Sequence, residues 1–245
     1  MGRGEAGYTG ASPVWVPGRN PYLPGAWQIQ EVYERAKRGE WGFFDPLPNI
    51  GDAYEGGFFA GFISHTADGN PTHGLIVAPA ASGYNGKATL QWKTSNTATS
   101  GTQSPFDGLA NSNSMNNASH PAAQYCRGLS IGGYTDWYLP ARYELDIAYE
   151  NLKPTTTSNN TSWGINDYSV PKRTSNRTAG APAQTSIAAF QSGGAEGFVA
   201  GFHWSSTENA ASTDRAWGLS FFNGSQSGDP KGTSYYVRAF RKFAL

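Results

Sequence analysis

The segment GLSIG, from Gly128 to Gly132, has the G-x-S-x-G spacing of a serine-hydrolase nucleophile elbow. In that site the serine lies on a sharp turn between a strand and a helix, and a later acidic residue and a histidine activate it. Asp136 and His203 do follow in the chain. However, a helical pattern precedes the segment, a loop or strand follows it, and no HGGG-like oxyanion segment is present. The pattern therefore favours a glycine-flanked loop.

Metal binding is the second chemistry to consider. The four histidines form no HExxH motif or other short ligand pair: His65, His73, His120 and His203. His203 stands beside Trp204 in an apolar stretch, which is typical of a hydrogen-bonded core imidazole. Cys126 is the single cysteine, which excludes an internal disulfide and a zinc site of several thiolates. We expect no cofactor, with a structural calcium in an Asp- or Asn-rich loop left open and unplaced.

Charge and hydropathy exclude several classes of partner. The chain has 245 residues, with Lys+Arg 18 and Asp+Glu 18, so its formal net charge is zero. This balance indicates no nucleic-acid partner. No apolar run is long enough for a membrane-spanning helix, and the N-terminus lacks the apolar region of a signal peptide. We expect no membrane insertion, and an extracellular role would follow release by cell lysis.

The spacing predicts two parts. Residues 1–40 read as a Gly- and Pro-rich extended arm followed by a short helix at 26–38, for attachment or oligomerisation. Residues 41–245 read as one domain of short strands and long loops. Its expected elements are two strands around a turn at 68–71, a strand in ATLQWKT, helices at 119–127 and 139–152, polar loops at 94–119 and 153–186, and strands near 198–204, 215–222 and 234–243.

The helix at 139–152 has the clearest period. Its apolar stripe consists of Ala141, Leu145, Ala148, Tyr149 and Leu152. Arg142 and Asp146 stand four residues apart and can pair. For the helix at 119–127, we expect Ser119 to be the N-cap.

Four separated motifs carry a family resemblance. They are GGYTDWYLPARYELDIAYENL, HWSSTE, RAWGLSFFNG and SYYVRAF. The chain from about residue 41 resembles the C-type-lectin-like domain that ends the bacterial collagen-like adhesins and recurs in phage tail-fibre and receptor-binding proteins. In that family a helix follows W-Y-L-P, W-S-S-T-E opens the terminal strands and Y-x-V-R ends the domain. The matching positions are Trp137–Pro140, Trp204–Glu208 and Tyr235–Arg238.

The resemblance implies an α+β, C-type-lectin-like fold: twisted antiparallel sheets with two helices and long irregular loops, plus the N-terminal arm. It implies a virion protein of a phage tail fibre or tail tip, a homotrimer that contacts other tail proteins and binds a host cell-surface glycan or protein receptor. Some such proteins are diversified by retroelements that mutate adenines. The residues between WSSTE and SYYVRAF are of the types that such mutation produces.

Alternation along AWGLSFF predicts that Trp217, Leu219 and Phe221 face inward and that Ser220 and Phe222 face solvent. Exposed side chains on a rigid frame can vary at little cost in stability. We expect polar loop residues to surround an exposed Phe222. The predicted ligand-binding residues are Asn209, Asp214, Arg215, Ser220, Phe222, Asn223, Gln226, Ser227 and Asp229.

Two other functions fit the same strands. One is a structural decoration of the virion that binds no receptor. The other is an enzyme related to the formylglycine-generating enzymes, which need paired cysteines for copper. Because the chain has a single cysteine, the sequence favours a protein that is not an enzyme.

Overall fold

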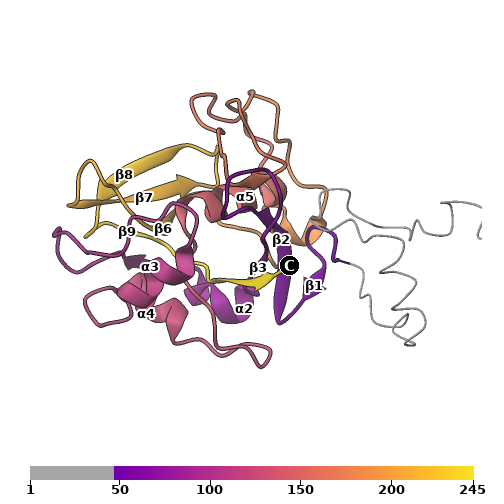
Figure 1. Cartoon of the computed structure of the whole chain (residues 1–245). Helices are drawn as coiled ribbons and strands as arrows, with labels where there is room; N and C mark the ends of the chain where they lie inside the picture. The colour runs from indigo at the N-terminus through magenta and orange to yellow at the C-terminus, as the bar shows by residue number, and fades with distance from the viewer. Residues whose placement is uncertain (1–46) are drawn as a thin grey trace, which may run out of the picture. The chain divides into compact units, whose positions relative to one another are not determined.

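The computed structural model describes residues 47–245, of which Pro48–Leu245 form one compact unit. The predicted arm and helix within residues 1–40 lie outside the described residues. The described part combines helices with mainly antiparallel sheets, which confirms the α+β prediction (Figure 1).

Two five-stranded sheets form the frame. In the first, the order is β1 (Ala53–Tyr54), β2 (Gly57–Ile63), β3 (His73–Val77) and β10 (Phe240–Ala244), and β5 (Ser169–Val170) also pairs with β2. In the second, the order is β4 (Thr89–Gln91), β9 (Ser234–Tyr236), β6 (Phe202–Glu208), β7 (Arg215–Ser220) and β8 (Gln226–Pro230). The described helices are α2 (Ala80–Gly83), α3 (Gly108–Ser114), α4 (Pro121–Arg127) and α5 (Arg142–Leu152), with 3-10 turns η2 (Asn85–Lys87) and η3 (Ala188–Phe190).

The predicted hairpin around residues 68–71 is β2 and β3, which pair antiparallel. At its turn, the Asp68 carboxylate accepts a hydrogen bond from the backbone N–H of Asn70 at 2.9 Å. Gly69 adopts a φ of +87°, a conformation that favours glycine. β10 pairs with the other side of β3, so the final strand completes the first sheet.

α5 is the predicted helix, but it begins at Arg142 rather than at residue 139. The preceding Tyr138 pairs its backbone with Phe240, which holds the approach to the helix extended. The predicted apolar stripe is buried and packs toward β2 and β7. α5 therefore links the two sheets.

Two predictions about the other helices were wrong. The N-cap of α4 is His120, not Ser119, because Pro121 is the first helical residue. The predicted loop 94–119 contains α3, where the Asp107 carboxylate accepts a backbone hydrogen bond of the first turn at 3.0 Å. The sequence GLANSNS has no apolar period, so pattern alone did not reveal this helix.

The C-terminal part has five strands where three were predicted. The expected strands correspond to β6, to β7, and to β9 with β10. β8 was predicted as loop because QSGDP lacks β-branched and aromatic residues. It pairs along the whole of β7, from Leu219 opposite Gln226 to Arg215 opposite Pro230.

Candidate functional site

The β7–β8 hairpin carries most of the predicted recognition residues, and buried aromatic groups hold it in place. Leu219 and Phe221 are buried, as predicted, and the rings of Phe221 and Phe198 stack with centroids 3.9 Å apart. In the neighbouring strand, the Trp204 indole N–H donates to the backbone carbonyl of Leu90 at 3.0 Å. These contacts fix the main chain of the hairpin from within.

The predicted residues fall into two groups rather than one. Asp214 and Arg215 lie at the start of β7, close to the end of β8, because Arg215 pairs with Pro230. Phe222 and Asn223 lie in the turn after β7. The length of β7 separates these ends by roughly 17–20 Å at 3.4 Å per residue. The expectation that the polar residues surround Phe222 was therefore wrong.

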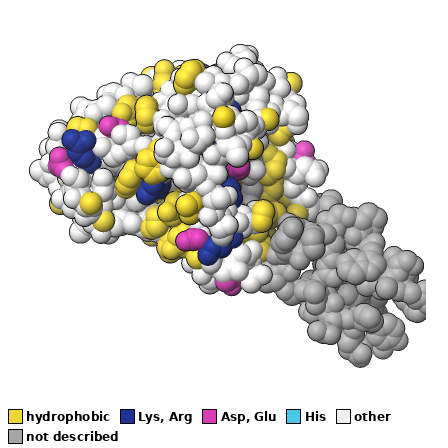
Figure 2. Space-filling model, turned by 90° about the horizontal axis from the view of Figure 1, so that it is seen from above, with side chains coloured by type: hydrophobic (Ala, Val, Ile, Leu, Met, Phe, Trp, Pro, Cys, Tyr) yellow, Lys and Arg dark blue, Asp and Glu magenta, His cyan; other side chains and the backbone are white. Residues whose placement is uncertain are grey.

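Three of the predicted side chains are clearly exposed. Asp214 and Arg215 have 54% and 43% of their side-chain surface accessible, and Phe222 is 48% exposed. The other partly exposed members are Asn209, Asn223, Ser227 and Asp229. Figure 2 shows charged side chains of both signs as sparse, interspersed patches on the face seen from above. This surface suits short-range contacts rather than long-range attraction.

The prediction that Ser220 and Gln226 belong to a solvent-facing surface was wrong, because both are buried. The Ser220 hydroxyl oxygen accepts from the backbone N–H of Phe222 at 3.3 Å. The Gln226 amide donates to Asp146 Oδ1 at 3.0 Å and accepts from Arg142 Nε at 2.6 Å. α5 lies against this part of the hairpin, so these two side chains support the surface from below.

The turn after β7 is tied to the loop that follows α5. The Thr155 hydroxyl donates to the backbone carbonyl of Phe222 at 2.8 Å. Gly224 adopts a φ of +75°, and a Cβ at this position would lie 2.5 Å from Tyr149 Cε1. A side chain larger than hydrogen is therefore excluded at position 224, while the Phe222 side chain projects outward.

Asp146 is the centre of a buried network behind the hairpin. It accepts from Asn166 Nδ2 at 3.0 Å and forms ion pairs with Arg173 and Arg177. The predicted pair between Arg142 and Asp146 does not form. Asp146 instead holds the loop 153–186 against α5, and this loop lies above α5 beside β7 and β8 in Figure 1.

A cluster that the sequence did not indicate lies beside the middle of β7. Trp217 is partly exposed rather than fully inward, and its ring meets that of Trp163 edge-on with centroids 6.0 Å apart. The Arg142 guanidinium carbon lies 3.8 Å from the Trp217 ring centroid and 5.4 Å from that of Trp163. Burial lowers the pKa of Arg142 from its ordinary value. We call these three side chains the Trp–Arg–Trp cluster.

The candidate catalytic groups are not assembled. GLSIG follows α4 and pairs only through an isolated bridge between Ile131 and Tyr134, so the strand-turn-helix of an elbow is absent there. His203 is a core imidazole, as predicted: its ring hydrogen-bonds the Tyr84 hydroxyl and the backbone carbonyl of Gly201. Burial lowers the pKa of His203 to about 3, which keeps the ring neutral.

The described histidines and the cysteine do not form a metal site. The rings of His65 and His73 contact each other at a tilt beside the β2–β3 turn, with centroids 4.3 Å apart. No group of three or more His, Cys, Asp or Glu side chains within residues 47–245 could hold a metal ion. Cys126 is buried, and burial raises the pKa of its thiol. No helix in this range is long and apolar enough to cross a membrane.

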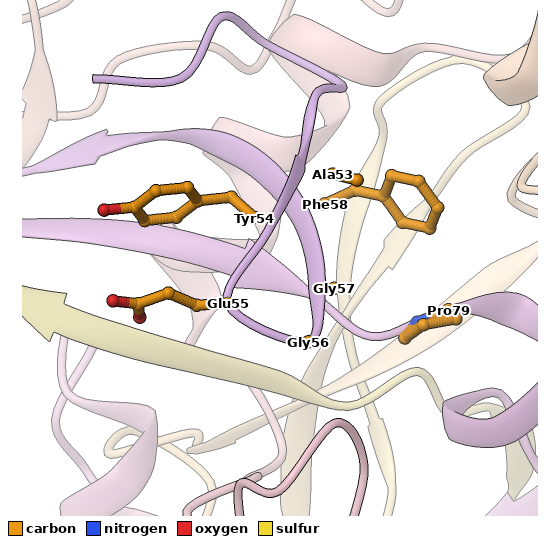
Figure 3. A pocket seen from close by; sticks show the side chains of 7 residues that line it. All are labelled: Ala53, Tyr54, Glu55, Gly56, Gly57, Phe58 and Pro79. Carbon is orange, nitrogen blue, oxygen red and sulfur yellow. The ribbon is translucent and has the colours of Figure 1, made fainter. Parts of the chain in front are cut away.

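An open depression of about 420 Å³ lies at the β1–β2 turn, and Figure 3 shows the residues that line it. Backbone and apolar groups around Gly56, Phe58 and Pro79 form most of its wall. Its one ionised side chain, Glu55, is paired with Arg241. The depression contains none of the predicted recognition residues.

Comparison with known proteins matches the sequence to a family. A family model described as the Lcl C-terminal domain matches residues 84–241, which is well over half of the chain. The matched range contains α3, α4, α5 and the whole second sheet, including the β7–β8 hairpin. A comparison with curated proteins gave no match.

Proposed function

The chain belongs to the Lcl C-terminal domain family, and from this membership we propose that it is a receptor-binding adhesin of a phage virion. The match also confirms the resemblance that the separated motifs indicated. The protein sits on a tail fibre or tail tip and recognises a host cell-surface ligand through the β7–β8 hairpin surface, defined as the exposed side chains of the strands β7 and β8 and of the turns before and after β7.

The exposed Phe222 on a firmly held turn is the observation that best supports this proposal. Phe222 is 48% exposed, while its backbone carbonyl accepts from the Thr155 hydroxyl and Tyr149 leaves no room for a Cβ at Gly224, two residues further on. An aromatic side chain on a rigid turn provides a contact that loses little conformational entropy on binding. Asp214 adds an exposed charge at the other end of the hairpin.

The remaining parts of the proposal concern the fold, the assembly, the receptor and the diversification of the gene. The fold is C-type-lectin-like, the protein assembles as a homotrimer with other tail proteins, and its receptor is a host glycan or protein. The protein is not an enzyme and needs no cofactor. A diversity-generating retroelement varies the exposed hairpin codons, so a near-copy of codons 205–240 that differs chiefly at adenines is expected nearby in the genome.

The test uses the double variant Asp214→Ala/Phe222→Ala in the full chain. We expect its binding to host cells to fall at least about tenfold, which corresponds to about 1.4 kcal/mol. Leu245→Ala is the matched control, because it removes a 45% exposed apolar side chain next to the first sheet. Unchanged binding by a correctly folded double variant would contradict the receptor site and favour a structural role in the virion.

A further inference from the structure

The Trp–Arg–Trp cluster contains a positively charged group that the fold leaves available. Arg142 uses Nε to bind the Gln226 amide oxygen at 2.6 Å. Its terminal nitrogens, Nη1 and Nη2, make no hydrogen bond with the described residues. Neither nitrogen is among the buried unpaired atoms in residues 47–245, so both reach the surface.

The plane of this guanidinium is fixed before any ligand arrives. Gln226 is itself anchored, because its amide nitrogen donates to Asp146. Trp217 lies against one side of the guanidinium, with the ring centroid 3.8 Å from Cζ. Trp163 lies nearby at 5.4 Å. An immobilised guanidinium presents its two terminal nitrogens as a fork, and a carboxylate accepts such a fork through both oxygens.

The surrounding charges indicate a ligand with one negative group rather than many. The arginines behind the cluster, Arg173 and Arg177, are already paired with Asp146 and Glu150. The exposed Asp214 on the same hairpin would repel further negative charge. The two half-buried indoles beside Arg142 offer apolar surface next to the fork.

We propose that Arg142, Trp163 and Trp217 form a binding subsite for a single carboxylate beside an aromatic ring. An aspartate or glutamate next to an aromatic residue on a protein receptor has this chemistry. The inference rests on the proposed function, since it names the ligand chemistry of the same surface. The cluster lies next to the middle of β7, between the two exposed groups of the hairpin, so one receptor can contact all three.

The test measures binding of phenylacetate to the full chain by NMR, following the indole N–H signals of Trp163 and Trp217. We expect both signals to shift with a dissociation constant of about 1 mM. Phenylacetamide, the neutral analogue, should bind the unaltered chain at least about fivefold more weakly, because it lacks the carboxylate. Phenylacetate should bind the Arg142→Lys variant at least about fivefold more weakly, because lysine lacks the forked guanidinium. Lys87→Gln is the control: it removes an exposed positive charge in η2, outside the hairpin, and should leave phenylacetate binding unchanged.

Equal binding of phenylacetate and phenylacetamide, or unchanged binding by Arg142→Lys, overturns the subsite. Tighter binding of glucuronate than of phenylacetate overturns the choice of a protein ligand. Contacts between the phenylacetate ring and the two indoles, measured in the unaltered chain as nuclear Overhauser effects, test the position of the site without any variant. Phenylacetate binding alongside unchanged host-cell binding by Asp214→Ala/Phe222→Ala would support the subsite and contradict the proposed receptor surface.

Discussion

Glu144 shows how a single residue joins segments far apart in the chain. Its Oε2 accepts from the backbone N–H of Ala141 at 2.7 Å and from that of Gly108 at 3.2 Å. Its Oε1 accepts from the Tyr138 hydroxyl at 2.9 Å. Burial raises the pKa of Glu144 to about 7, and this effect outweighs the hydrogen bonds that favour the carboxylate.

We predict that Glu144 makes the chain less stable as the pH rises from about 4.5 to about 7. The folded chain keeps a proton in this window that the unfolded chain has released, so the free energy of unfolding falls by up to about 3 kcal/mol. Glu144→Gln removes this contribution. Urea unfolding of wild type and variant, below pH 4.5 and above pH 7, checks this prediction. The contributions of other titrating groups cancel in the difference between the two free energies of unfolding.

A pH-independent difference between the two chains would contradict the raised pKa. Tyr138→Phe is a useful companion variant. It removes one hydrogen bond to Glu144 but keeps the buried carboxyl, so its free energy of unfolding should retain a fall over the same pH range.

At the scale of elements, the recognition surface depends on contacts among α5, the loop 153–186 and the β7–β8 hairpin. Asp146 connects all three, since it binds Asn166 and two arginines of the loop and Gln226 of the hairpin. The loop has little regular structure of its own. The buried ion pairs therefore determine where Trp163 stands relative to Trp217.

We predict that Asp146→Asn loosens the loop and the hairpin more than the first sheet. The variant leaves Arg177, whose side chain is almost fully buried, without a carboxylate at Nη2, and the loss of one partner of a buried ion pair typically costs about 3–5 kcal/mol. Amide hydrogen exchange should speed up most in peptides covering 160–178 and 221–226. A uniform acceleration that includes β2 and β3 equally would show that Asp146 stabilises the whole domain and not these segments.

At the scale of the molecule, the exposed hairpin residues and the buried frame differ in their tolerance of substitution. Asn209, Asp214, Phe222 and Ser227 are exposed or partly exposed. We predict that alanine or serine at these positions changes the free energy of unfolding by about 0.5 kcal/mol or less each. Ser220→Ala and Gln226→Ala should cost more, because each removes a buried hydrogen bond. Thermal unfolding of the six single variants checks this prediction. An equal loss of stability at the exposed and the buried positions would contradict it.

The family motifs could be recognised from sequence because they are part of the core. Trp137, Trp204 and Val237 are buried. Glu208 is buried in an ion pair with Lys231, and Arg238 in one with Glu196 at 2.6 Å. Groups of this kind tolerate few alternatives, so the motifs predicted the α+β class. The hairpin β2–β3 was predicted from its turn residues, and α5 from its apolar period. The motifs carry no information about the ligand.

The Trp–Arg–Trp cluster could not be predicted in the same way. It joins Arg142 of α5, Trp163 of an irregular loop and Trp217 of β7, and no periodic pattern spans these segments. The burial of Gln226 depended on the same long-range packing. A single tryptophan in the Ser-, Thr- and Asn-rich stretch 155–163 was the one available signal, and its meaning required the fold.

The pairing of β10 with β3 affects the order in which the protein can mature. β3 lies at residues 73–77, and its partner β10 begins at Phe240. During synthesis, this edge of β3 therefore stays unpaired until about 160 further residues have been translated. A prematurely terminated product would expose an unpaired apolar strand edge, which favours aggregation or degradation. Assembly would therefore favour chains that have been translated through β10.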